Sequence, residues 1–177
     1  MRSRYKIHDE NGIFFVTSTI VNWIPVFVNE AYFSIMINTM KHYQDKNDLI
    51  IYAYVFMPNH FHMIISNDDI SKIMQSAKKY SARKIIENLK IDCNDAILKA
   101  FREFKPEYKT TSIHQVWQES FHPKEIVSYE MLKQKIEYIH NNPVRKSLVE
   151  KPEDWEYSSA KDYYTDKKGL LDIVRLV

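Results

Sequence analysis

The sequence predicts an α+β fold: a ferredoxin-like antiparallel sheet of the split βαβ type, with helices packed mainly on one face. Three observations support this class. Segments with strand and helix patterns follow one another in the order strand, helix, strand, strand, helix, strand, helix. The 177 residues, 45% of them hydrophobic, suffice for one globular domain with a buried core. No internal repeat and no low-complexity segment interrupts this order.

The first half of the chain predicts a strand, a helix and a hairpin. Residues 13–20 are aromatic and β-branched, which is typical of a strand. Residues 31–42 place apolar side chains three and four positions apart, which indicates a helix. Two further strands, at 49–57 and 60–66, flank a Pro-Asn pair whose residue types favour a tight turn. These two strands should therefore pair as a hairpin.

Residues 71–90 predict an amphipathic helix with a basic outer side. The segment has six Lys or Arg residues against the single acidic Glu87, a local charge of +5. Four of these cations fall on one line opposite the apolar stripe, and we call them the basic row: Lys72, Lys79, Arg83 and Lys90. Such a row either neutralises the phosphates of a nucleic acid or is a solvated helix face.

The second half of the chain is less regular until its last long helix. The polar segment 91–113 fits a short helix and a loop, and residues 115–121 fit a fourth strand. Ser128 is a suitable N-cap for the next helix. We expect that helix to end at Asn142, because Pro143 disfavours helical geometry in the residue before it.

The composition excludes several classes of site. Two glycines, 157 positions apart, cannot build a Walker loop or a dinucleotide fingerprint, so no nucleotide cofactor is expected. A single cysteine excludes an internal disulfide and a cysteine-based zinc site. No apolar run approaches the roughly 20 residues that span a bilayer, and no apolar signal core follows the basic N-terminus. We therefore expect a soluble cytoplasmic protein without a membrane partner.

The triplet His60-Phe61-His62 is the first candidate for chemistry. Side chains alternate along a strand, so both imidazoles point to one face while Phe61 points to the other. Two imidazoles two residues apart can bind one divalent cation, and a catalytic site would need a third ligand from elsewhere. The alternative is that the two histidines belong to an ordinary polar sheet face.

The second candidate lies on the last long helix. Tyr138 and Asn142 are one turn apart and therefore lie on the same side of that helix. A phenol and an amide oxygen are thus presented together. The alternative is a tyrosine that packs at the flank of the helix and an asparagine that ends it.

Several blocks of this sequence resemble a known family. Tyr54–Ile65 resembles the metal-binding HUH strand of the single-tyrosine, IS200-like transposases. Residues Trp117–His122 and Tyr138–Val144 resemble the REP-associated tyrosine transposase branch of that superfamily. Trp155–Ala160 resembles its C-terminal block, and Arg4–Lys6 resembles its N-terminal start. The blocks occur in the family's order along most of the chain.

The resemblance implies roles for individual residues. The family's histidine pair, which binds Mg²⁺ or Mn²⁺, corresponds to His60 and His62, and its nucleophilic tyrosine corresponds to Tyr138. The third metal ligand lies four residues later. It is commonly glutamine in insertion-sequence enzymes, whereas this chain has Asn142, which is one methylene shorter and still offers a carbonyl oxygen.

The resemblance also implies partners. Single-stranded or hairpin DNA would be the substrate, contacted by Arg4 and the basic row. Lys135 would assist ionisation of the tyrosine. His122 and His140 are candidates for contacts with DNA or with groups around the metal, and ordinary structural roles are the favoured alternative.

At the scale of the whole chain, the resemblance implies one HUH endonuclease domain over residues 1–177. The segment 91–113 is a candidate insertion, and a C-terminal extension starts at about residue 145. The expected protein is a nucleoid-associated monomer or homodimer.

The function that follows is a metal-dependent single-stranded DNA endonuclease and strand transferase. It would form a 5′-phosphotyrosine intermediate on hairpin-flanked DNA. One alternative is a catalytically silent regulator of the same fold that binds DNA or RNA hairpins. A more distant alternative is a small-molecule metalloenzyme that uses the histidine pair.

Overall fold

A four-stranded sheet forms the centre of the computed structural model, which describes residues 12–108, 110, 112–119, 121 and 123–176. The strand order is β2-β3-β1-β4, and every neighbouring pair is antiparallel. The strands are β1 (Phe14–Thr19), β2 (Ile50–Met57), β3 (His60–Ser66) and β4 (Lys124–Glu125). β1 and β2 therefore run parallel with β3 between them, which confirms the predicted split βαβ fold.

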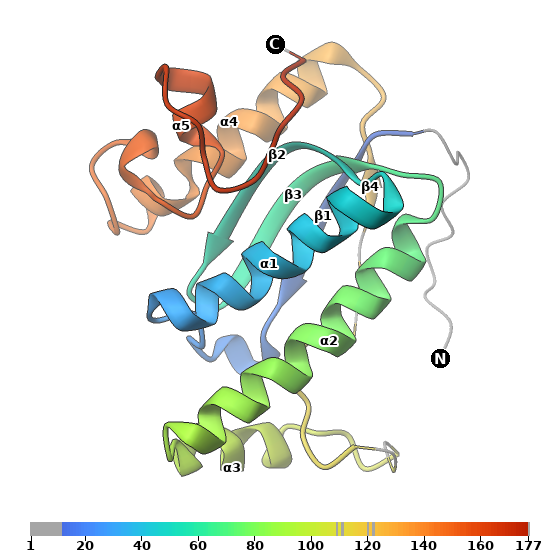
Figure 1. Cartoon of the computed structure of the whole chain (residues 1–177), viewed down its shortest axis with the longest axis vertical. Coiled ribbons are helices and arrows are strands. Elements are labelled where there is room, and N and C mark those ends of the chain that lie inside the picture. Colours follow the sequence, from blue (N-terminus) through green and yellow to red (C-terminus); the bar gives the residue numbers. More distant parts are fainter. Residues whose placement is uncertain (1–11, 109, 111, 120, 122, 177) are drawn as a thin grey trace.

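The helices cover both faces of this sheet unequally (Figure 1). Their bounds are α1 (Glu30–Asn47), α2 (Ile70–Ile91), α3 (Asp95–Glu103), α4 (Tyr129–Arg145) and α5 (Ala160–Tyr164), with short 3-10 helices η1 (Val21–Trp23) and η2 (Pro152–Asp154). Helices α1 and α2 pack side by side on one face, and α3 packs on α2. Helix α4 lies on the opposite face, against β2 and β3.

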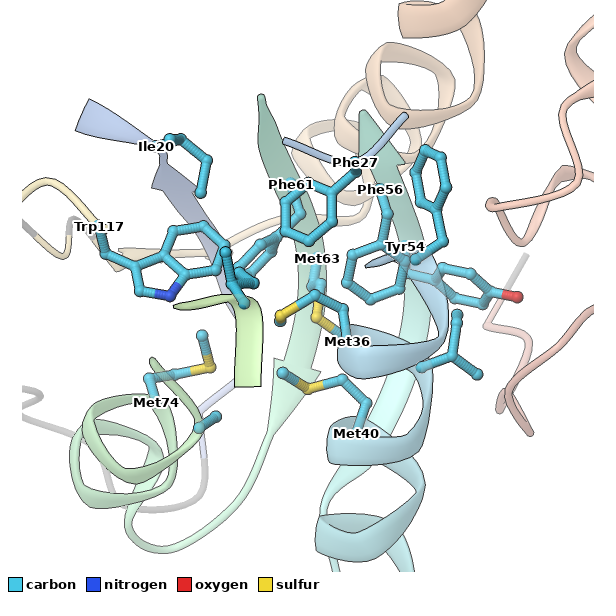
Figure 2. Close-up of a cluster of buried hydrophobic side chains, with 14 of the residues drawn as sticks. Ile20, Phe27, Met36, Met40, Tyr54, Phe56, Phe61, Met63, Met74 and Trp117 are labelled. Carbon is cyan, nitrogen blue, oxygen red and sulfur yellow. The ribbon is translucent and has the colours of Figure 1, made fainter. Parts of the chain in front are cut away.

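The alternation of β3 divides its side chains between two cores. Phe61 and Met63 point toward α1 and α2, where they pack in a large cluster with methionines of both helices and Trp117 (Figure 2). On the other face, Ile64 packs with apolar residues of α4. His60 and His62 lie on that second face, because they share the parity of Ile64.

The N-cap and the apolar stripe of helix α4 determine where it begins and which side of it packs on the sheet. The Ser128 side chain accepts a hydrogen bond from the Met131 amide, as expected for an N-cap. Leu132, Ile136 and Ile139 form the buried stripe that packs on the sheet. This stripe determines which of the remaining side chains of α4 can face the histidines.

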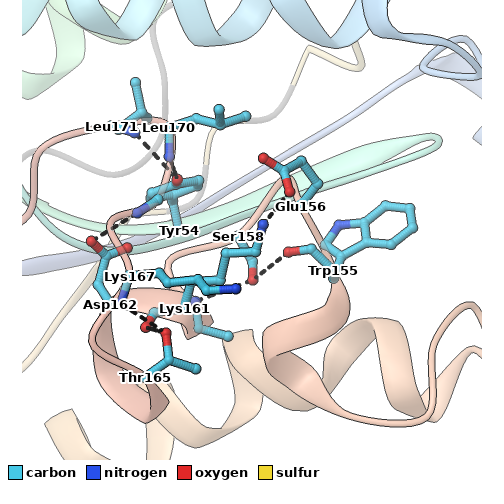
Figure 3. Close-up of polar contacts among 12 residues, drawn as sticks. Tyr54, Trp155, Glu156, Ser158, Lys161, Asp162, Thr165, Lys167, Leu170 and Leu171 are labelled. Atoms are coloured by element: carbon cyan, nitrogen blue, oxygen red, sulfur yellow. Dashed lines mark hydrogen bonds and ion pairs between the residues drawn. The ribbon is translucent and has the colours of Figure 1, made fainter.

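The segment that follows α4 covers the edge strand β2. The Phe56 amide donates to the Tyr157 carbonyl at 2.8 Å, and the Ser159 amide donates to the Tyr54 carbonyl at 3.0 Å. The hydroxyl of Tyr54 accepts from the amides of Leu170 and Leu171 at 3.0 and 3.3 Å (Figure 3). These bonds protect an edge that would otherwise be open to pairing with another chain.

The predicted strand at 115–121 is wrong. Trp117 forms only an isolated bridge with Ile20, and the fourth strand is the two-residue β4. Val116 and Trp117 are both buried, and Trp117 packs against Phe27 and Phe61. A short apolar segment that fills a space in the core has the same local composition as a strand.

The predicted end of the last long helix at Asn142 is also wrong. Helix α4 continues through Pro143 to Arg145. Proline removes one amide donor, but the Lys146 amide still donates to the Asn142 carbonyl at 3.2 Å and the Leu148 amide to the Pro143 carbonyl at 3.0 Å. Helix α1 likewise runs five residues past the predicted His42, to Asn47.

Among the described residues, none of the helices combines the length and the apolar composition that a membrane span requires.

Candidate active site

Two histidines of β3 face α4 at the centre of the sheet. His60 and His62 are each only 6% exposed, and their ring centroids are 4.9 Å apart. Phe61 between them is buried in the core on the opposite face. The pair is therefore held by a central strand and not by a mobile loop.

The tautomer of His60 follows from its neighbour Asn59. The Asn59 Nδ2 donates to the Trp23 carbonyl at 3.0 Å, so the amide oxygen is the atom that faces the imidazole. That oxygen lies 2.7 Å from His60 Nδ1 and can only accept, which places the ring proton on Nδ1. The Nε2 atom of His60 then keeps its lone pair.

His62 has an equivalent partner on β1. Its Nδ1 lies 2.7 Å from the Thr17 hydroxyl, and the two residues are paired across β1 and β3. The Thr17 oxygen can accept from Nδ1–H, which is the arrangement that leaves Nε2 free. The ring also stacks on Phe15, with centroids 5.3 Å apart.

The pair is neutral over the physiological range. Burial lowers the pKa of His60 to about 4, and the positive charge of Lys146 adds to this effect. Burial also lowers the pKa of His62 to about 3, assisted by His60 and Lys135. Neutral imidazole is the form that binds a metal ion.

Helix α4 presents Tyr138 to this pair. The Tyr138 ring makes edge contacts with His62 at 5.2 Å and with Phe15 at 6.0 Å between centroids. It is 37% exposed, so the phenol is accessible to a large substrate. The buried stripe of α4 holds the backbone of this residue in place while the phenol itself reaches solvent.

Cations flank the tyrosine on both sides. The Lys135 ammonium lies 5.6 Å from the Tyr138 ring centroid and 4.6 Å from that of Phe15. The Arg145 guanidinium carbon lies 5.8 Å from the Tyr138 ring. Burial, and then the charge of Lys124, lowers the pKa of Lys135. Positive charge at these positions stabilises a phenolate and attracts phosphate.

Asn142 lies one turn after Tyr138 on α4, about 40° around the helix. It is 6% exposed, and its side-chain oxygen is of the type that can bind a cation. The structure thus brings His60, His62 and Tyr138 into contact, and Asn142 follows Tyr138 one turn later on the same helix.

A sequence model of the IS200-like transposases matches residues 21–142, a span that includes both histidines, Tyr138 and Asn142. The chain belongs to the IS200-like transposase family. It is 26% identical over 169 residues to a Haemophilus influenzae protein whose own assignment as a REP-associated tyrosine transposase is provisional. That match covers 92% of this chain and 85% of the relative.

A solved structure, a REP-associated tyrosine transposase bound to a REP hairpin, shares the fold of this IS200-like transposase. The two superpose with a TM-score of 0.67 at 20% identity, over 100% of this chain and 99% of the other. The agreement extends to the C-terminal segment as well as to the sheet, because the whole chain is covered.

The donor set of this IS200-like chain fits a divalent cation. No cluster of three His, Cys, Asp or Glu residues suited to a metal occurs among the described residues. The candidate ligands are instead the imidazoles of His60 and His62 and the amide oxygen of Asn142. Imidazole suits transition metals and an amide carbonyl suits Mg²⁺ and Mn²⁺, so the mixture is compatible with Mn²⁺ as well as Mg²⁺.

The basic row lies elsewhere. Its four residues are exposed on the outer side of α2, which covers the face of the sheet opposite α4 (Figure 1). Arg83 is also paired with Glu87 at 3.7 Å. The sheet therefore separates the basic row from the histidine pair and Tyr138.

Of the other residues predicted to act in the transposase, the structure describes His140 but not Arg4 or His122. His140 is fully buried, with Nε2 2.9 Å from the Ser159 hydroxyl and Nδ1 3.3 Å from the Tyr164 hydroxyl. It lies about 200° around α4 from Tyr138, and its contacts join α4 to the C-terminal segment. Arg4 and His122 lie outside the described residues.

Sequence reasoning missed five residues that surround this site: Phe15, Thr17, Asn59, Arg145 and Lys146. Asn59 could have been predicted, because it directly precedes His60 and its side-chain amide can hydrogen-bond the imidazole and orient it. Thr17 had none, since its pairing depends on the register of β1 and β3. Arg145 was hidden by the expectation that the helix stops before Pro143.

Proposed function

We propose that this IS200-like transposase cleaves and rejoins single-stranded DNA through a 5′-phosphotyrosine at Tyr138. The observation that carries the proposal is the contact of an accessible Tyr138 with His62, in a pair of neutral, rigidly oriented imidazoles. Such an arrangement combines a nucleophile with a site for a phosphate-binding cation.

The bonds exchanged in the step are balanced without a co-reactant. The phenol oxygen of Tyr138 forms a bond to phosphorus, and the bond from phosphorus to O3′ breaks. The phenol proton is released to solvent, and the departing oxygen takes up a proton as a 3′-hydroxyl. A second 3′-hydroxyl can reverse the step and join strands, so no nucleotide hydrolysis is needed.

The chain's own residues prepare this exchange. Lys135 and Arg145 stabilise the negative charge that grows on the phenol as its proton leaves. Asn59 holds His60 in the tautomer that keeps its Nε2 atom available, and the Thr17 hydroxyl can accept from Nδ1–H of His62 to the same effect.

His60, His62 and Asn142 would hold the metal ion. When bound, Mg²⁺ or Mn²⁺ supplies charge that offsets the phosphate in the transition state.

The proposed substrate is a DNA hairpin with single-stranded flanks. The solved relative of the same fold is bound to a REP hairpin, and the sequence blocks of this chain resemble the REP-associated branch. Lys135, Arg145 and Lys146 would contact phosphates of the strand that is cleaved. The basic row on α2 would contact a part of the DNA that passes around the sheet.

Adduct formation tests this function. The purified chain, incubated with Mn²⁺ and a labelled hairpin with single-stranded flanks, should form a protein–DNA adduct that survives denaturation. Tyr138→Phe should form none, whereas Tyr129→Phe, at the first turn of the same helix, should behave as wild type. An adduct that persists in Tyr138→Phe would disprove the nucleophile. Hairpin binding without cleavage in Mg²⁺ or Mn²⁺ would instead identify a silent regulator.

A further inference from the structure

Four aromatic rings form a continuous row across the candidate active site. The centroid of Trp23 lies 5.6 Å from that of His60, His60 lies 4.9 Å from His62, and His62 lies 5.2 Å from Tyr138. The proposed reaction uses the last three rings. Trp23, at the other end of the row, has no role in it.

Trp23 is not a core residue. It is 56% exposed, whereas Trp117 is buried and the indole of Trp155 donates to the Phe56 carbonyl. The largest apolar side chain type is usually well buried, so this exposure gains no stability from packing. Exposed large aromatic side chains commonly mark a binding surface.

The backbone under Trp23 is strained. Asn22 and Trp23 have φ angles of 51° and 57°, in the left-handed region that asparagine tolerates and that a tryptophan rarely adopts. The conformation is held by the amide of Trp23 on the Ile20 carbonyl at 3.1 Å and by the amide of Ile20 on the Asn59 carbonyl at 2.8 Å. Strain that the surroundings maintain is typical of functional positions.

One amide couples this tryptophan to the histidine pair. Asn59 donates from Nδ2 to the Trp23 carbonyl and accepts at Oδ1 from His60. The backbone of Trp23 is thus held by the same side chain that orients a candidate metal ligand. A ligand of Trp23 would lie next to a phosphate at the histidines.

The surroundings select the chemical class of that ligand. Positive charge for a phosphate backbone is present along the row, because the Lys135 ammonium and the Arg145 guanidinium carbon lie 5.6 and 5.8 Å from the Tyr138 ring centroid. A flat, half-exposed indole beside a phosphate site suits a planar apolar group that is joined to a phosphate. An unpaired nucleobase has both properties, and base stacking on aromatic side chains is strong and tolerant of sequence.

We propose that Trp23 stacks on an unpaired base of the bound DNA strand, close to the scissile phosphate. This inference rests on the proposed function and adds a binding site to it. The strand would run from Tyr138 across the histidine pair to Trp23. The stacked base would fix the register of the strand, and so determine which phosphate meets Tyr138.

The test measures binding apart from cleavage, in a Tyr138→Phe background with Mg²⁺. The affinity for a fluorescently labelled hairpin with single-stranded flanks is compared for Trp23, Trp23→Phe and Trp23→Ala. Trp23→Ala should weaken binding by roughly 5- to 150-fold, the range measured for removal of one base–aromatic stack, and Trp23→Phe by much less. Phe104→Ala is the matched control, because Phe104 is 46% exposed at the end of α3.

An abasic scan of the flanks then locates the base. At one position, removal of the base should weaken binding to the Trp23 protein as much as Trp23→Ala does, and should have no further effect on Trp23→Ala. Equal affinity of Trp23 and Trp23→Ala, or additive effects at every position, would overturn the inference. The adduct assay on wild type distinguishes the two proposals, since an adduct with no Trp23 effect overturns this inference alone.

Discussion

At the scale of single residues, the site depends on the partners of its histidines. Each histidine has a polar partner at Nδ1, so Nε2 is the nitrogen of each ring that is left to bind a cation. Alternation along a strand was enough to predict that both rings share a face. It could not predict Thr17 as a partner, because that hydrogen bond joins residues 45 positions apart.

Removal of the Thr17 hydroxyl should weaken metal binding. Thr17→Val keeps the shape and the strand preference of the side chain but leaves Nδ1 of His62 without a partner. Removal of such a partner typically costs about 10- to 100-fold in metal affinity. Titration of Mn²⁺ into the DNA-free protein, followed by electron paramagnetic resonance, measures this change.

Thr17→Ser serves as the control for this prediction. Serine keeps the hydroxyl and should therefore retain most of the wild-type affinity for Mn²⁺. If Thr17→Val and Thr17→Ser bind Mn²⁺ equally well, the hydroxyl does not orient His62.

At the scale of elements, α4 serves two functions on two sides. Tyr138 contacts His62 and reaches solvent, whereas His140, two residues later, is buried against the C-terminal segment. Burial lowers the pKa of His140 to about 4. The same helix therefore presents the proposed nucleophile on one side and is anchored by a neutral imidazole on the other.

This anchor should make stability dependent on pH. The pKa of His140 falls from 6.5 to about 4 on folding, so between these values the unfolded chain takes up a proton that the folded chain does not. Stability from this group is complete above pH 6.5 and declines as the pH falls. At pH 4.5 the decrease should reach about 2–3 kcal/mol. Urea unfolding in EDTA, at several pH values, measures it.

His140→Gln isolates the contribution of this residue, because His60 and His62 also resist protonation in the folded protein. The variant should be less stable than wild type at pH 7.5, and the difference should shrink toward pH 4.5. A difference that is constant over this range would show that His140 is not the titrating group.

At the scale of the whole molecule, the sheet separates two positively charged surfaces. Lys135 and Arg145 lie beside Tyr138 on the α4 face, and the basic row lies on the outer side of α2. In the proposed function, the first surface would meet the reacting phosphate. The second would act on DNA that extends beyond the candidate active site.

Neutralisation of the basic row should change affinity but not chemistry. With all four residues replaced by glutamine, the slope of log K against log salt for hairpin DNA should become shallower by about 0.7–0.9 for each phosphate that the row neutralises in wild type. The rate of adduct formation at saturating DNA should be unchanged. Filter binding at several salt concentrations and single-turnover cleavage measure the two quantities.

The matched control removes the same amount of charge from exposed lysines on other surfaces: Lys41, Lys46, Lys167 and Lys168. It should affect the salt slope less than the basic-row variant does. Equal slopes in the two variants would show that the basic row is a solvated helix face.

The sequence alone determined the order of the main elements and the residues proposed to carry the chemistry. Local patterns were sufficient for β3, whose predicted bounds match the structure, and for the cap at Ser128. The two-residue spacing of the histidines and the four-residue spacing of Tyr138 and Asn142 were read without knowledge of the tertiary fold. Such features are local, because a strand or helix imposes its own period on the chain.

Only the tertiary structure decided which of these residues meet. The predicted strand around Trp117 and the predicted end of α4 before Pro143 were wrong, because burial and packing override local preference. The register of β1 on β3 placed Thr17 on His62, and the turn before β3 joined Trp23 to His60. The separation of the basic row from Tyr138 likewise depends on which face of the sheet each helix covers. These are relations between distant segments, and no local period of the sequence contains them.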